Sequence, residues 1–123
     1  MLARVWSAAI AGINAIKVGV EVDVSGGLPK IIVVGLPDVA IQESRERVKA
    51  ALKNTGFAFP VRKIVINLTP ADLRKEGPCF DLPISVGILA ASEQVDPQLL
   101  GDYLFYGEVS LDNLNIYKTF NCP

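Results

Sequence analysis

The segment "EGPCFDLPISVGILAAS" contains the residue of this chain that is best suited to nucleophilic chemistry. Cys79 follows a Gly-Pro pair and comes shortly before an apolar run that predicts a buried helix. Because the positive end of a helix dipole lowers the pKa of a nearby thiol, a thiolate at this position would be a good nucleophile. Cys79 is therefore the candidate catalytic residue.

A general base for Cys79 is hard to find in this sequence. The chain has no histidine, so the base would have to be a lysine such as Lys75 or Lys118, as in enzymes that use a Ser-Lys pair. Burial beneath Phe80 and Leu82 would favour the neutral thiol, and full desolvation outweighs a helix dipole, which contributes about 0.3–1 kcal/mol. We therefore interpret Cys79 as an unreactive packing residue and predict no catalytic residue, with hydrolysis as the alternative.

The sequence predicts neither a bound cofactor nor a metal ion. The glycine-rich patterns GxxxxGK[ST] and GxGxxG, which cradle nucleotide phosphates, do not occur. Two cysteines without a CxxC pair, in a chain without histidine, leave no typical zinc ligand set. Glu21 and Asp23 share one face of a predicted strand, but without a third ligand we interpret them as part of a solvated face rather than a metal or acid–base pair.

The charge pattern argues against direct binding of nucleic acid. The formal net charge is −1, and Arg45, Arg47 and Lys49 alternate with Glu43 and Glu46 instead of forming a basic stripe. A nucleic-acid site would require seven basic positions to converge on one face: Arg45, Arg47, Lys49, Arg62, Lys63, Arg74 and Lys75.

Length and composition fit one globular domain. The chain has 123 residues, half of them hydrophobic, which is enough to bury one core. Cys79 and Cys122 are too few for a disulfide framework, so we expect a reducing, cytoplasmic location. We expect no membrane association, because no run of 18 apolar residues occurs and the opening "MLARVWSAAIAGINA" is too short and too interrupted for a signal peptide.

Hydrophobic periodicity predicts an α/β fold that begins with strands. Strict alternation over residues 16–24 is typical of a strand with one wet face, residues 3–10 provide a partner, and residues 30–34 form a third strand. We therefore expect three consecutive antiparallel strands. A helical period then begins after Asp38, a suitable N-cap, and ends at Gly56. Its apolar stripe consists of Ile41, Val48, Ala51 and Leu52, and Glu43 is spaced to pair with Arg47 on the surface.

The second half of the chain repeats the change from strand to helix. "KIVINL", residues 63–68, has an unbroken apolar centre, which predicts a central strand covered on both faces. Asp81 is expected to cap a buried helix formed by "LPISVGILAAS". "DYLFYGEVSL", residues 102–111, is expected to be the last strand.

Three segments, "VVGLPDVAIQESRERVKAALKNTGFAFP", "INLTPADLRKEG" and "FDLPISVGILAAS", together resemble the N-terminal domain of the magnesium-chelatase-like AAA+ proteins, the ComM/YifB family. The resemblance defines an expected domain over residues 1–112 and a divergent tail over residues 113–123. It implies an α/β (α+β) fold like the second domain of ribosomal protein S five, also used by the proteolytic domain of Lon. That fold has one mixed sheet, two main helices and a left-handed crossover, against the usual right-handed preference.

The same resemblance implies that an AAA+ ATPase module follows this domain in relatives, and that ComM-type proteins act in natural transformation as hexameric branch-migration motors on DNA. It also places Cys79 where the Lon segment "DGPSAG" has its serine nucleophile. In Lon the partner lysine lies on a helix after a strand resembling "YGEVSLD". Here the sequence changes character at Asn113, so we do not assign that role to Lys118.

We therefore interpret the sequence as a non-catalytic N-terminal interaction domain of a magnesium-chelatase-like AAA+ ATPase, here without its ATPase module, and not as an enzyme. The expected partners are the ATPase module, another protein surface or a second copy of the chain, with DNA contacted only indirectly. The alternatives are a cryptic Lon-like hydrolase that uses Cys79 and a nucleic-acid-binding domain of the same fold.

Overall fold

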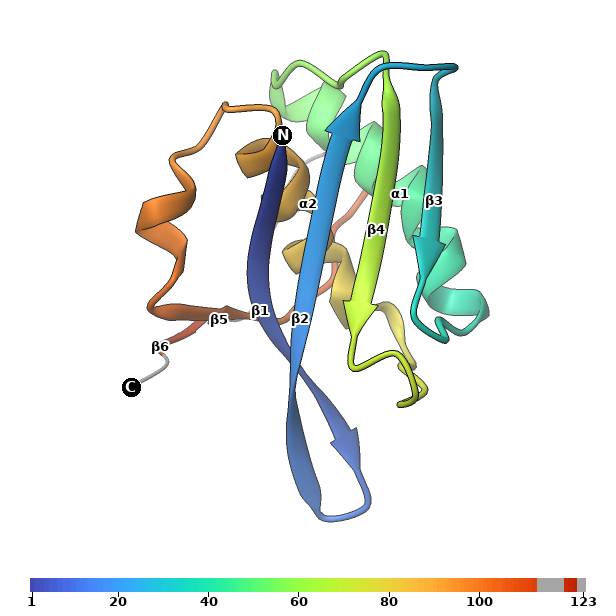
Figure 1. Ribbon diagram of the computed structural model, residues 1–123, viewed down its shortest axis with the longest axis vertical. Helices are drawn as coiled ribbons and strands as arrows, with labels where there is room; N and C mark the ends of the chain where they lie inside the picture. The colour runs from blue at the N-terminus through green and yellow to red at the C-terminus, as the bar shows by residue number, and fades with distance from the viewer. Residues whose placement is uncertain (113–118, 122–123) are drawn as a thin grey trace.

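The computed structural model describes residues 1–112 and 119–121, which form one mixed sheet with two main helices (Figure 1). The strands are β1 (Leu2–Ala11), β2 (Asn14–Ser25), β3 (Lys30–Val34), β4 (Lys63–Thr69), β5 (Tyr103–Phe105) and β6 (Thr119–Asn121), in the spatial order β3-β4-β2-β1-β5-β6. The helices are α1 (Val39–Thr55) and α2 (Asp81–Ala91), with 3₁₀ turns η1 (Pro78–Phe80) and η2 (Pro97–Leu100). The α/β (α+β) class expected from the sequence is confirmed. Within the described residues, no helix combines the length and the apolar character that crossing a bilayer requires.

The first two strands form the long hairpin that their alternation predicts. β1 and β2 pair antiparallel, with Val5 opposite Val20. Val18, Val20 and Val22 are fully buried, because every second side chain of β2 points toward the helices. The hairpin tip extends beyond the rest of the sheet in Figure 1 and exposes the side chain of Ile13.

The third predicted strand runs in the expected direction but does not pair with the second. β4 lies between them, antiparallel to β2 and parallel to β3, so that Ile66 is flanked by Val22 and Val33. Hydrophobic periodicity gives a strand's exposed face but not its neighbour, so the insertion of β4 is invisible in the sequence pattern. As a result β3 forms one edge of the sheet.

The connection from β3 through α1 to β4 is left-handed. In Figure 1 both helices lie behind the sheet, β3 lies to the right of β4, and both arrows point downward. The chain rises through α1 behind the sheet and returns to the top of β4, which gives a left-handed turn. This rare hand agrees with the resemblance and could not be expected from general rules of connection.

β4 is an interior strand, as predicted, but only one of its faces is fully covered. Ile64, Ile66 and Leu68 are fully buried against the helices. Val65 and Asn67, which point to the other face, are only half-buried. The prediction of two covered faces is wrong because both helices pack on the same side of the sheet.

The caps of α1 are those that the sequence predicts. The Ile41 amide donates to Oδ1 of Asp38 at 2.9 Å, and Gly56 ends the helix with φ +101°. The predicted stripe of α1 is fully buried, with Ile41, Val48, Ala51 and Leu52 all at 0% exposure. This stripe fixes how α1 packs and therefore which of its side chains reach α2.

The predicted capping of α2 by Asp81 is wrong. Asp81 is the first residue of the helix, and Phe80 occupies the N-cap position without a side-chain cap bond. Because η1 leads directly into α2, the helix begins one residue earlier than the sequence pattern suggests. The Asp81 carboxylate points toward α1 instead.

The predicted last strand is also much shorter in the structure. β5 ends at Phe105, because the chain then turns to bond with the start of α2. The Gly107 amide donates to the carbonyl oxygen of Cys79 at 2.8 Å, and the Gly107 carbonyl accepts from the Leu82 amide at 3.0 Å. Residues 106–112 therefore hold the entrance of α2 rather than extending the sheet.

Close packing of α2 on the sheet generates a first prediction. A Cβ atom at Gly87 would lie 2.6 Å from Cγ2 of Val22, a stiff β-branched side chain in the core. Gly87→Ala should therefore lower the free energy of unfolding by about 1–3 kcal/mol, despite the higher helix propensity of alanine. Urea denaturation measures this change, and Gly101→Ala, where a Cβ meets nothing within 4 Å, is the matched control. Increased stability of the Gly87 variant would contradict the packing.

Candidate functional site

A buried lysine joins the ends of the two parallel strands. Lys75 is completely buried, and its ammonium group donates to the carbonyl oxygens of Gly35 at 2.9 Å, Leu68 at 3.0 Å and Pro70. Burial lowers the pKa of Lys75, and the charge of Asp72 partly offsets this effect. Each of the three ammonium protons thus has a backbone acceptor.

Asp38 connects the same two loops through its carboxylate. Oδ1 caps α1, whereas Oδ2 accepts from the Gly77 amide at 3.0 Å. The backbone amide of Asp38 also donates to the Lys75 carbonyl at 3.1 Å. The segments "GLPD" and "LRKEGP" therefore form one hydrogen-bonded unit, although about 40 residues separate them.

A second polar cluster joins α1 to α2. Asp81 is fully buried and accepts from Nε of Arg47 at 2.8 Å, from Nη2 of Arg47 at 3.1 Å and from the Ser44 hydroxyl. The hydrogen bond with Asp81 raises the pKa of Arg47. Arg47 thus forms its ion pair between helices rather than with Glu43, which is the partner that spacing along α1 predicts.

Cys79 lies in η1 and is half-buried rather than enclosed beneath Phe80 and Leu82. Its thiol lies beside Tyr106, and their side-chain hydrogen bond, together with burial, raises the pKa of the Tyr106 phenol. Lys75, one candidate base, already donates its three protons to backbone carbonyls. Lys118, the other candidate, lies outside the described residues.

The carboxylates of β2 belong to an ordinary strand surface. Glu21 bonds with Arg4 and accepts from Nδ2 of Asn67 at 2.9 Å, and these bonds lower its pKa. Among residues 1–112 and 119–121, no group of three acidic, cysteine or histidine side chains is arranged to hold a metal ion. The solvated-face interpretation of Glu21 fits its partners, whereas the absence of a cofactor stays a prediction.

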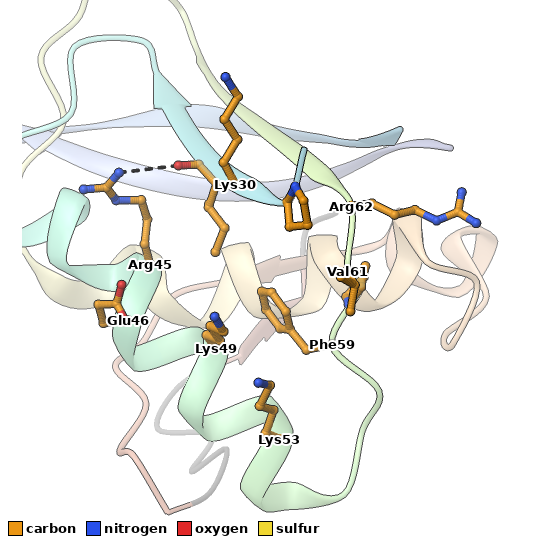
Figure 2. A pocket seen from close by; sticks show the side chains of 11 residues that line it. Lys30, Arg45, Glu46, Lys49, Lys53, Phe59, Val61 and Arg62 are labelled. Atoms are coloured by element: carbon orange, nitrogen blue, oxygen red, sulfur yellow. Dashed lines mark hydrogen bonds between the residues drawn. The ribbon is translucent and has the colours of Figure 1, made fainter. Parts of the chain in front are cut away.

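A basic groove lies between the sheet edge at β3, the helix α1 and the loop of residues 59–62 (Figure 2). Its volume is about 400 Å³. Its cationic lining residues are Lys30, Arg45, Lys49, Lys53 and Arg62, and its single carboxylate is Glu46. The apolar lining residues are Pro29, Ile31, Phe59, Pro60 and Val61. Five cations against one carboxylate make this groove strongly positive.

The seven basic positions that a nucleic-acid site would require do not converge. Arg45, Lys49 and Arg62 line the basic groove, and Lys63, at the start of β4, is not among its lining residues. Arg47 binds Asp81, Lys75 is buried and Arg74 pairs with Glu76 at 3.2 Å. Sequence reasoning missed Lys30 and Lys53 as members of the groove. The spacing of Lys49 and Lys53 places them on one face of the helix, and this was the available signal for a basic surface. Lys30 could not be added from the sequence, because its place in the groove depends on β3 lying beside α1.

Known proteins resemble this chain along most of its length. The sequence profile of the family described as subunit ChlI of Mg-chelatase matches residues 20–117. The uncharacterized protein YifB of Salmonella typhimurium is 49% identical over 110 residues, which cover 89% of this chain and 22% of the relative. The YifB protein of Escherichia coli and the competence protein ComM of Haemophilus influenzae are each 47% identical over the same shares. The chain thus spans about a fifth of the length of these relatives.

The Arg47–Asp81 pair generates a second prediction. Arg47→Met should lower the free energy of unfolding by roughly 3 kcal/mol, because it leaves a fully buried carboxylate without its charged partner. The double variant Arg47→Met, Asp81→Leu should recover most of this loss, because an apolar pair carries no desolvation penalty. A double-mutant cycle measured by urea denaturation provides the test. Purely additive effects of the two substitutions would contradict the pairing.

Proposed function

Because this chain belongs to the family of the Mg-chelatase subunit ChlI, we propose that it is a non-catalytic N-terminal interaction domain of a magnesium-chelatase-like AAA+ ATPase. The observation that carries the proposal is the bonding of Lys75, whose three ammonium protons are all donated to backbone carbonyls. A catalytic lysine must instead present a free amine lone pair to its nucleophile. The lysine nearest in sequence to Cys79 therefore acts as a structural cross-link.

The alternative of a Lon-like hydrolase has little support in the described residues. The phenol of Tyr106 is a titratable neighbour of the Cys79 thiol, and its raised pKa keeps it protonated at neutral pH, so that it cannot accept the proton of the thiol. The Gly107 amide donates to the Cys79 carbonyl at 2.8 Å. The surroundings of Cys79 thus serve to hold the entrance of α2.

The proposed role is contact with protein: the ATPase module, another copy of the chain or a further partner surface. The hairpin tip supports this role, because Ile10 and Ile13 are 75% and 101% exposed on a projection from the sheet. DNA would be contacted indirectly, through the ATPase module that the domain binds. The name of the Haemophilus influenzae relative, a competence protein, supports the proposed link to natural transformation. The proposed link to DNA recombination and the proposed cytoplasmic location rest on the sequence analysis.

The non-catalytic half of the proposal predicts an inert thiol. With Cys122→Ser in place so that one thiol reports, Cys79 should react with iodoacetamide at neutral pH no faster than a free model thiol. The folded chain should also leave unfolded casein uncleaved. Alkylation faster than the model thiol, together with cleavage that disappears in Cys79→Ala, would establish the hydrolase instead.

The interaction half predicts binding to the rest of a relative. The remainder of the Escherichia coli relative, expressed without the matching 110 residues, should bind this chain with a dissociation constant on the order of micromolar. Calorimetric titration measures the association. Mg-ATP titrated into the chain alone is the control and should give no saturable heat. Absence of binding to the remainder, in a chain shown to be folded, would remove the support for this role.

A further inference from the structure

The basic groove lies along an edge strand whose outer side has no partner strand in the described residues. β3 pairs with β4 on one side only, so a row of backbone groups over Lys30–Val34 remains available on the other side. The contact of α1 with this edge is slight, since Nη1 of Arg45 reaches the Ile31 carbonyl at 3.4 Å. Such an edge can accept an additional strand.

The cations of the basic groove are not neutralised by the protein itself. None of Lys30, Arg45, Lys49, Lys53 and Arg62 forms an ion pair in the described part of the chain. They face one carboxylate, that of Glu46, in a chain whose overall charge is −1. Positive charge is thus concentrated at this edge and favours an acidic ligand.

The lining of the groove favours a peptide over a nucleic-acid strand. Ile31 and Phe59 pack against the core and offer an apolar surface between the cations. The Lys49 ammonium lies 5.9 Å from the centroid of the Phe59 ring, so this face is occupied by a cation rather than open to a stacked base. A nucleic-acid strand would also need Arg47 and Lys75 to bind its phosphates, but Arg47 bonds with Asp81 and Lys75 with the Leu68 carbonyl.

We propose that the basic groove binds an extended peptide segment of a partner protein, with alternating acidic and apolar side chains, as an added strand on the free edge of β3. Successive side chains of an added strand point to opposite faces, so the acidic ones would face Lys49 and Lys53 on the helix side of the sheet, while the apolar ones would lie beside Ile32 and Val34 on the other side. The inference rests on the proposed role as an interaction domain and adds the surface and the chemistry of the ligand.

The test uses fluorescein-labelled peptides and anisotropy at low salt. The probe is an eight-residue peptide of alternating valine and glutamate, compared with a valine–lysine peptide and with the same valine–glutamate peptide N-methylated at alternate residues. The first should bind, and the other two should not, because one has the wrong charge and the other cannot complete the main-chain ladder. On binding, amide hydrogen exchange should slow over Lys30–Val34.

A charge-reversal variant shows whether binding is located in the groove. Lys49→Glu, Lys53→Glu should weaken binding of the valine–glutamate peptide by about tenfold or more. The matched control Lys17→Glu, Arg74→Glu reverses two exposed charges elsewhere and should change binding less than about twofold. Denaturation midpoints verify that both variants fold.

Four outcomes would overturn the inference. Equal binding by the Lys49, Lys53 variant would place the peptide outside the groove, and equal binding of the N-methylated peptide would exclude strand addition. Tighter binding of a twelve-residue oligothymidylate, lost in the same variant, would make the groove a nucleic-acid site. If the valine–glutamate peptide does not bind while the remainder of the Escherichia coli relative does, this inference fails and the proposed interaction role stands.

Discussion

The fold depends on one constraint: the ends of β3 and β4, two parallel strands joined by a left-handed crossover, must be held together. At these ends the backbone groups leave the sheet and need other hydrogen-bond partners. The Lys75 ammonium meets this requirement by bonding carbonyls after β3 and at the end of β4. The contact is close, because a Cβ atom at Gly35 would lie 2.2 Å from the Leu68 carbonyl oxygen, and Gly35 adopts φ +104°. A buried charge is tolerated here because all its donors are satisfied.

The other polar contacts extend outward from this junction. Asp38 joins the two loops and begins α1, and α1 then presents Arg47 to Asp81 at the first turn of α2. Segment 106–112 closes the arrangement through Gly107. The segments that carry the family resemblance are thus largely those that build this connected network, in which their polar residues hold the loops and helices together.

The surfaces left free by this network have distinct character. The hairpin tip is apolar and projects from the sheet. Within the described residues, the basic groove combines cations that form no ion pair with an edge strand that has no outer partner. The elements that carry them, β2 for the tip and β3 and α1 for the groove, are held by buried core residues such as Val22, Val33 and Val48. A rigid core with contrasting exposed edges is suited to presenting docking surfaces.

The sequence by itself determined the local features: the alternation of β2, the buried stripe of α1 and the capping of that helix by Asp38 and Gly56, because these depend on neighbours within a few residues. Tertiary structure alone decided that β4 separates β2 from β3, that Asp81 binds Arg47 rather than capping α2, and that Lys75 is buried. It also brought Lys30 beside Lys49 and Lys53 to form the basic groove. These contacts join residues distant in the sequence, and a periodic pattern contains no information about which strand or helix will become a neighbour.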